Sequence, residues 1–219
     1  MPNHVISRIT LRGEEAAVAA ALADLVDESG PKAVVDFGRL VPMPKDLDIE
    51  DRSDARMVFE ALGDGWRRIA TYPWVPEEAQ ASRESLLRFL RERFGEEAFA
   101  LAERYQRNLE RYGHITWYGW CCERWGTKWN AYRSRVAIRE PGLAVVELQT
   151  AWAEPEPVVA LLAERHPGVE VLHRFADELL NFCGWRRYVR GALVEESRAP
   201  GEWLAELGFS PEAIEDEAL

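Results

Sequence analysis

Residues 4–37 have the sequence HVISRITLRGEEAAVAAALADLVDESGPKAVVDF, in which strand, helix and strand patterns follow one another. Residues 4–12 are rich in β-branched side chains and stop at Gly13, as is typical of a strand. A helix follows, because apolar side chains recur at i, i+4, i+7 and i+8 from Val18. Gly30-Pro31 ends that helix, and residues 33–37 are predicted to be a second strand. The stretch therefore predicts a β-α-β unit.

The second half of the chain repeats this pattern. Strands are expected over 133–139 and 143–151, with a turn at Pro141-Gly142, because Pro presets φ and Gly accepts positive φ. A helix that begins near Pro155 and a strand over 169–175 complete a second β-α-β half. Residues 182–188 and 189–195 are then expected to form a closing hairpin or two edge strands. Two such halves predict an α+β fold, a ferredoxin-like sandwich with a helical insertion between the halves.

The domain organisation follows from these halves. Residues 1–199 are predicted to be one ferredoxin-like domain with a helical, Trp-rich insertion at about 45–132. Ser53 and Ser82 are candidate N-caps for two helices of that insertion. Residues 200–219 are predicted to be an acidic helical C-terminal tail, since six acidic residues and no basic residue fall between 201 and 219.

Composition excludes several classes of protein. The chain has 219 residues, of which 47% are hydrophobic, so it is neither disordered nor coiled-coil. Its 38 acidic and 27 basic residues give a net charge of −11, which disfavours nucleic acid as a partner. No apolar run approaches a membrane span, and the N-terminus has no signal-peptide pattern, so no membrane association is expected.

The cysteines favour a reducing compartment. Cys121 and Cys122 are adjacent and Cys183 is alone, which makes a poor disulfide framework. A cytoplasmic location is therefore expected. The histidines are scattered, so buried thiols explain the cysteines better than a metal site does. No cofactor and no metal are predicted.

The chemistry-bearing segment is 117–132, with the sequence WYGWCCERWGTKWNAY. Lys128 lies between Trp125 and Trp129 in sequence, and a cation between aromatic faces is able to hold a phosphate, a base or an acidic peptide. The alternative is that the rings are core residues which wedge the insertion onto the sheet. The candidate ligand-binding residues are Trp120, Glu123, Trp125, Gly126, Thr127, Lys128, Trp129, Asn130 and Trp152.

Several short motifs in a fixed order carry a family resemblance: 36–44 (DFGRLVPMP), 117–120 (WYGW), 125–130 (WGTKWN), 150–155 (TAWAEP) and 182–184 (FCG). Together they resemble the YubB-like, ferredoxin-like domain family of bacterial, plasmid and phage proteins, across most of residues 1–195. The resemblance implies a ferredoxin-like fold and cytoplasmic residence, and it carries no activity that can be transferred. His4 stands where an aromatic residue is common in the family, and the acidic tail is additional.

The sequence motifs favour binding over catalysis. The chain has no nucleotide-binding fingerprint, no G-x-S-x-G elbow and no H-E-x-x-H helix. Cys122, with His114 and Asn130, is the candidate set of residues for nucleophilic catalysis. The leading hypothesis is a non-catalytic binding or interaction protein that uses a Trp-rich groove, with a protein or small molecule as its partner. The alternative is a single-stranded nucleic-acid-binding protein with a ferredoxin-like sheet; an acidic mimic that blocks a basic partner and an enzyme of unknown type remain open.

Overall fold

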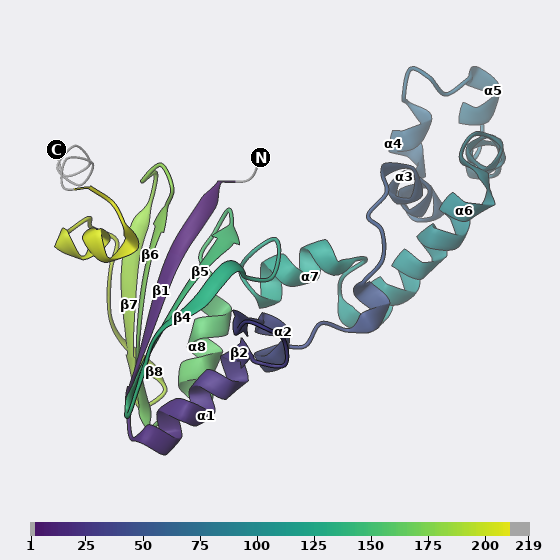
Figure 1. Cartoon of the computed structure of the whole chain (residues 1–219). Coiled ribbons are helices and arrows are strands. Elements are labelled where there is room, and N and C mark those ends of the chain that lie inside the picture. The colour runs from purple at the N-terminus through teal and green to yellow at the C-terminus, as the bar shows by residue number, and fades with distance from the viewer. Residues whose placement is uncertain (1–2, 211–219) are drawn as a thin grey trace. The chain divides into compact units, whose positions relative to one another are not determined.

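The computed structural model describes residues 3–210, and the chain divides into two compact units (Figure 1). Residues Met1–Pro42 and Cys121–Leu219 form one unit, called here the sheet unit, and Met43–Trp120 form the other, called the helical unit. The helix α7 (Trp117–Arg124) contains the boundary between them.

The sheet unit is built on one antiparallel sheet of six strands in the order β4-β5-β1-β6-β7-β8. The central strand β1 pairs with β5 on one side, with Ile9 opposite Val146, and with β6 on the other, with Ile9 opposite His173. The strands are β1 (His4–Gly13), β4 (Tyr132–Glu140), β5 (Leu143–Ala151), β6 (Val169–Asp177), β7 (Cys183–Val189) and β8 (Ala192–Ser197).

Two helices, α1 (Glu15–Leu25) and α8 (Glu156–Arg165), cover one face of this sheet (Figure 1). Helix α1 buries Val18, Ala21, Leu22 and Leu25. Alternate residues of β1 are buried, as expected for a strand with one covered face. The units β1-α1-β4 and β5-α8-β6 interlock, because β5 lies between β1 and β4 and β1 lies between β5 and β6. The predicted α+β, ferredoxin-like sandwich is confirmed.

The second strand of the first half is not where the sequence predicts it. Of residues 33–37, β3 (Val34–Val35) is extended, and it pairs only with the two-residue β2 (Val26–Asp27), outside the main sheet. The Asp36 side chain accepts a hydrogen bond from the Gly38 amide and thereby caps α2 (Phe37–Leu40). The strand that completes the first half is β4, so the chain passes through residues 43–120 before it reaches that strand.

The C-terminal part of the sheet unit adds a hairpin and a short helix. Strands β7 and β8 form the predicted hairpin, joined at Arg190 and Gly191, which have φ of 55° and 81°. The 3₁₀ helix η2 (Glu202–Leu207) buries Leu204 and Leu207 in a cluster with Ala176, Leu180 and Cys183. Residues 211–219 of the predicted acidic helical tail lie outside the described residues. The 200–219 tail as a whole stays a prediction.

The helical unit has its own core, built from α3 (Ser53–Leu62), α4 (Trp66–Ala70), α5 (Glu77–Gln80) and α6 (Arg83–Tyr112), after the 3₁₀ turn η1 (Lys45–Leu47). Val58, Ile69, Leu86 and Leu90 are buried there. Gly95 interrupts α6 with φ 76° and ψ 173°. Ser82 caps α6 by accepting from the Ser85 amide, as predicted. The predicted Ser53 cap is wrong, because Ser53 is already the first helical residue.

Three polar side chains, those of His173, Ser7 and Arg186, are buried together on the helix-covered face of the sheet. His173 is fully buried, its Nε2 lies 3.1 Å from Ser7 Oγ, and its strand partner is Arg186. Burial, together with the positive charges of Arg186 and Arg198, lowers the pKa of His173 to about 3. His173 is therefore neutral in the folded protein at every pH at which cells live.

This burial predicts acid sensitivity. The unfolded chain takes up a proton at His173 near pH 6.5, and the folded chain does not. The contribution of neutral His173 to the free energy of unfolding is therefore fully present above pH 6.5 and is lost as the pH drops toward 3. When the pH is lowered from 7.5 to 4.5, the free energy of unfolding measured in urea should fall by roughly 2–3 kcal/mol more in the wild type than in the non-titrating His173→Gln variant. Equal losses in both proteins would contradict the assignment.

Candidate functional site

Trp125 anchors the segment 125–130 to the sheet unit. It follows α7 directly, its ring is 6% exposed, and its Nε1 donates to the carbonyl of Val41 over 3.0 Å. The ring also meets Phe37 edge-on, with 6.0 Å between centroids. Since α7 ends at Arg124, Trp125 and Trp129 do not share one side of a helix. Trp125 is a structural residue rather than a wall of a groove.

Gly126 and Thr127 shape the loop that follows. Gly126 has φ 77°, and a Cβ at this position would stand 2.6 Å from Cδ of Pro157. Thr127 is 1% exposed, and its hydroxyl donates to the carbonyl of Trp129 over 2.6 Å. The motif thus needs glycine for both its backbone conformation and its close approach to α8.

Asn130 joins this loop to the segment near residue 36. Its Oδ1 accepts from the amides of Phe37 at 2.9 Å and Ala131 at 2.8 Å, and its Nδ2 donates to Asp36 Oδ1 at 2.6 Å. Residues 93 and 94 positions apart in the sequence are therefore held side by side. With its amide used in this way, Asn130 orients the backbone, and the catalytic arrangement with Cys122 and His114 loses its third member.

The exposed part of the motif is the Lys128 cluster, defined as Lys128, Trp129 and Trp152. The ammonium Nζ lies 4.6 Å from the ring centroid of Trp129 and 4.3 Å from that of Trp152. Trp129 is 39% exposed and Trp152 is 45% exposed. The lysine does contact two indoles, but the second is Trp152, from the end of β5, where the sequence pointed to Trp125.

Trp152 is held in an unusual backbone conformation. Its φ is 74°, in the left-handed region that bulky residues rarely adopt. Its amide donates to the carbonyl of Asn3 over 3.0 Å, and the Thr150 hydroxyl donates to the carbonyl of Ala153 over 2.7 Å. These bonds fix the bend that turns the indole toward Lys128.

A buried ion network lies two residues beyond Trp152. The Glu154 carboxylate Oε1 is 3.2 Å from Arg186 Nη2 and 3.0 Å from Arg198 Nη2. Arg186 also reaches Glu196, and Arg187 pairs with Glu170 at 2.7 Å. Arg186 and Arg187 are therefore both paired with carboxylates, and Arg186 supports the turn that carries Glu154. The sequence shows these charges but gives no sign of their pairing.

The remaining predicted site residues lie on α7. Trp120 is 6% exposed and so is a core residue. Glu123 is exposed, with its carboxylate 3.6 Å from Arg124 Nε. Burial raises the pKa of the neighbouring Cys121 thiol to about 12, which disfavours the reactive thiolate form. Among residues 3–210, no three His, Cys, Asp or Glu side chains are grouped to hold a metal ion.

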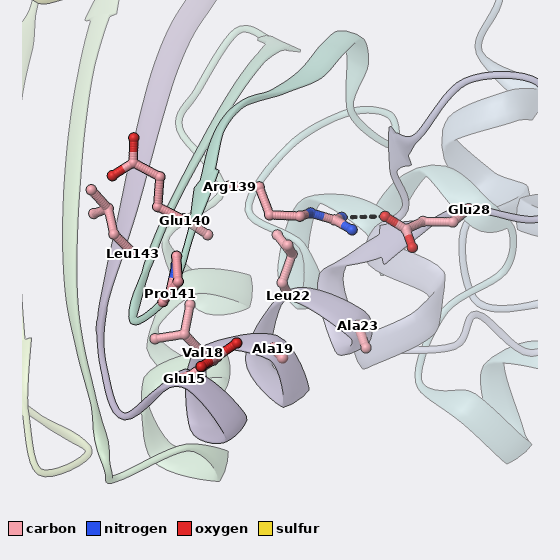
Figure 2. A pocket seen from close by; sticks show the side chains of 11 residues that line it. Glu15, Val18, Ala19, Leu22, Ala23, Glu28, Arg139, Glu140, Pro141 and Leu143 are labelled. Atoms are coloured by element: carbon pink, nitrogen blue, oxygen red, sulfur yellow. Dashed lines mark hydrogen bonds and ion pairs between the residues drawn. The ribbon is translucent and has the colours of Figure 1, made fainter.

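A separate cleft of about 330 Å³ opens between α1 and the β4–β5 turn (Figure 2). Its walls are apolar, with Val18, Leu22 and Leu143, and Glu28 and Arg139 form an ion pair across one side. The sequence indicates both elements, but nothing in it says that the hairpin turn lies over α1. This cleft is lined by residues outside the predicted site.

Three arginines on the sheet face opposite the helices are paired with carboxylates. Arg8 and Arg135 both bind Glu147, and Arg174 binds Glu206 of η2. Base-stacking ferredoxin-like domains use this face, which requires exposed aromatic side chains and free cations. The pairing with carboxylates weighs against nucleic acid on this face. Within the described residues, no helix is both long and apolar enough to cross a membrane.

The comparisons with known proteins agree with this architecture. The sheet order and helix placement define a ferredoxin-like domain protein. Residues 124–217 match the family model described as the ferredoxin-like domain in Api92-like protein. The resemblance to the YubB-like family is confirmed.

Two known proteins were found to be similar to this chain. The uncharacterised protein YubB of Escherichia coli K12 is 32% identical over 87 residues, which are 39% of this chain and 60% of YubB. The crystal structure of protein api92 from Yersinia pseudotuberculosis is 12% identical, with a TM-score of 0.49 over 90% of this chain and 98% of that one. The chain thus spans about three fifths of the length of the curated relative it matches.

The Asn130 contacts predict a large effect on stability. Asn130→Ala leaves the Phe37 and Ala131 amides and one Asp36 oxygen without this partner, so the free energy of unfolding should fall by about 1–3 kcal/mol. Gln149→Ala, which removes a single exposed hydrogen bond from Arg133, is the control and should change it by less than about 1 kcal/mol. Urea unfolding measures both, and similar small changes would refute the structural role of Asn130.

Gly126 gives a second, steric test. Ala at Gly126 and Ala at Gly208 share the cost of a left-handed residue, about 1–2 kcal/mol. Only Gly126 has a neighbour in the way, because nothing lies within 4 Å of a Cβ at Gly208. The melting temperature of Gly126→Ala should therefore be well below that of Gly208→Ala. Equal melting temperatures would show that the Pro157 contact imposes no constraint.

Proposed function

We propose that this chain is a non-catalytic binding protein whose partner contacts the Lys128 cluster. The observation that carries the proposal is the exposure of two indole rings, Trp129 at 39% and Trp152 at 45%, held against one lysine. Trp rings bury much apolar area when a partner covers them, which is why they are common among residues that dominate binding energy.

The backbone of Trp152 supports a binding role. A bulky residue at φ 74° costs about 1–3 kcal/mol, and such strain clusters at ligand sites. The loop that carries Lys128 and Trp129 is held at both ends, by Trp125 to Val41 and by Asn130 to Asp36. A rigid cluster loses less conformational entropy on binding than a flexible one does.

The chemistry of the cluster favours a protein partner with an acidic segment. The ammonium of Lys128 carries three donors and two aromatic neighbours, so a carboxylate is its natural acceptor. The indole surfaces then suit an apolar or aromatic side chain next to that carboxylate. Residues 113–152 carry five basic and three acidic residues, which gives this stretch a net charge of +2 in a chain of −11.

A displayed peptide library tests the proposal. The wild-type chain should enrich 12-residue peptides that contain a carboxylate beside an apolar residue, and the Lys128→Ala/Trp129→Ala/Trp152→Ala variant should bind them at least ten-fold more weakly. Leu179→Ala, at a side chain that is 69% exposed in the same unit, is the matched control. Enrichment of no peptide, or equal binding by the triple variant, would refute the role of the cluster.

Single-stranded nucleic acid is the second candidate, because indoles beside a lysine are also able to stack and pair with a base and its phosphate. Titration with an oligonucleotide of twenty thymidines then quenches tryptophan fluorescence in the wild type, with a steep salt dependence. Loss of this quenching in the triple variant would identify the ligand of the cluster as nucleic acid. A flat titration at low salt removes this candidate.

A further inference from the structure

The helical unit contains a basic pocket that is independent of the Lys128 cluster. It encloses about 330 Å³ and is lined by Asp46, Arg104, Arg107, Asn108 and Arg111. Three guanidinium groups thus face one concavity together with a single carboxylate. In a chain with a net charge of −11, such a local excess of positive charge is unusual.

The arginines come from one face of α6. Arg104, Arg107 and Arg111 are at i, i+3 and i+7, so they follow one another on successive turns and span about 10 Å along the helix axis. Tyr105 and Asn108, between them in sequence, are buried and fix the helix against the rest of the unit. Asn108 Nδ2 donates to the carbonyls of Asp46 and Ile115, which holds the wall opposite the arginines in place.

Two of these arginines have no carboxylate of their own. Asp46 Oδ2 is taken by Arg111 at 3.2 Å and by the Tyr112 hydroxyl at 2.7 Å. Within the described part of the chain, neither Arg104 nor Arg107 forms an ion pair.

Other arginines of the same unit differ in this respect. Arg52, Arg88 and Arg91 each have a carboxylate partner, at 2.6, 3.7 and 3.0 Å. The nearby Glu110 does not serve Arg107, since its Oε1 accepts from Gln106 at 2.7 Å. The pocket therefore presents two guanidinium groups whose donors are open to a ligand.

We propose that this pocket binds a phosphate group, with Arg104 and Arg107 as its principal ligand contacts and Arg111 at the rim. The planar, always charged guanidinium pairs with phosphate oxygens through two parallel N–H donors, and successive arginines on one helix face are able to reach adjacent phosphates. A phosphodiester chain and a free polyphosphate share this chemistry.

The experiment uses the full chain and two probes, a fluorescein-labelled oligonucleotide of twenty thymidines by anisotropy and inorganic pyrophosphate by calorimetry. Arg104→Ala/Arg107→Ala should weaken binding at least about ten-fold and lower the slope of log K against log salt by about 1.4 for the single-stranded oligonucleotide. Arg68→Ala/Arg88→Ala, which removes the same charge from two exposed ion pairs of this unit, should leave binding within about two-fold.

The outcomes separate the sources and the sites. Loss of oligonucleotide binding assigns the pocket to a phosphodiester chain, and loss of pyrophosphate binding alone assigns it to a small phosphate compound. The Lys128→Ala/Trp129→Ala/Trp152→Ala variant should still bind the phosphate probe at this pocket. A negative result at one of the two sites therefore does not affect the proposal for the other. If neither probe binds, or if both double variants lose binding equally, the pocket is not a phosphate site.

Discussion

The hydrogen bonds that join Asn130 to the Asp36 carboxylate and to the Phe37 amide are the constraint on which the sheet unit depends. They join the point where the chain leaves this unit, at residue 42, to the point where it returns, at residue 121. Trp125, donating to Val41, closes the same junction a few residues away. Without this closure, the β4–β5 hairpin would have to find β1 after the excursion through residues 43–120 with only sheet pairing to guide it, and closing so long a loop costs entropy.

The same junction decides which residues are exposed for binding. Within the motif 125–130, Trp125, Gly126, Thr127 and Asn130 are used to build the loop. Lys128 and Trp129 are what the loop displays, and Trp152 is brought to them from the end of β5. The Trp-rich segment is thus both scaffold and surface, which unites the two interpretations that the sequence leaves open.

Much of the fold could be predicted because its signals are local. The apolar stripe of α1, the Pro141-Gly142 turn and the β7–β8 hairpin each depend on residues that are close in sequence. The strand expected over 33–37 fails for a local reason as well, since the Asp36 side chain caps a helix there and competes with the strand. The β-branched residues before Asp36 favour a strand in the sequence, and the helix cap at Asp36 is not apparent from them.

The site was harder to predict, since its contacts are distant in sequence. The Trp152 ring meets Lys128 only because β5 ends beside the loop, and no periodicity encodes that contact. Arg186 is buried and shared between Glu154 and Glu196, and its neighbours in sequence do not indicate either pairing. Arg104 and Arg107 look like ordinary residues of a charged helix, and only the three-dimensional pairing shows that they lack carboxylates.

Hydrogen exchange at the Phe37 amide tests the central claim most directly, because this N–H group donates to Asn130 and lies outside the main sheet. If the junction is part of the cooperative core, this amide exchanges with a free energy close to that of β1 amides such as Ile9. Exchange at the rate of an exposed loop, with β1 still protected, would show that the sheet unit folds without the junction.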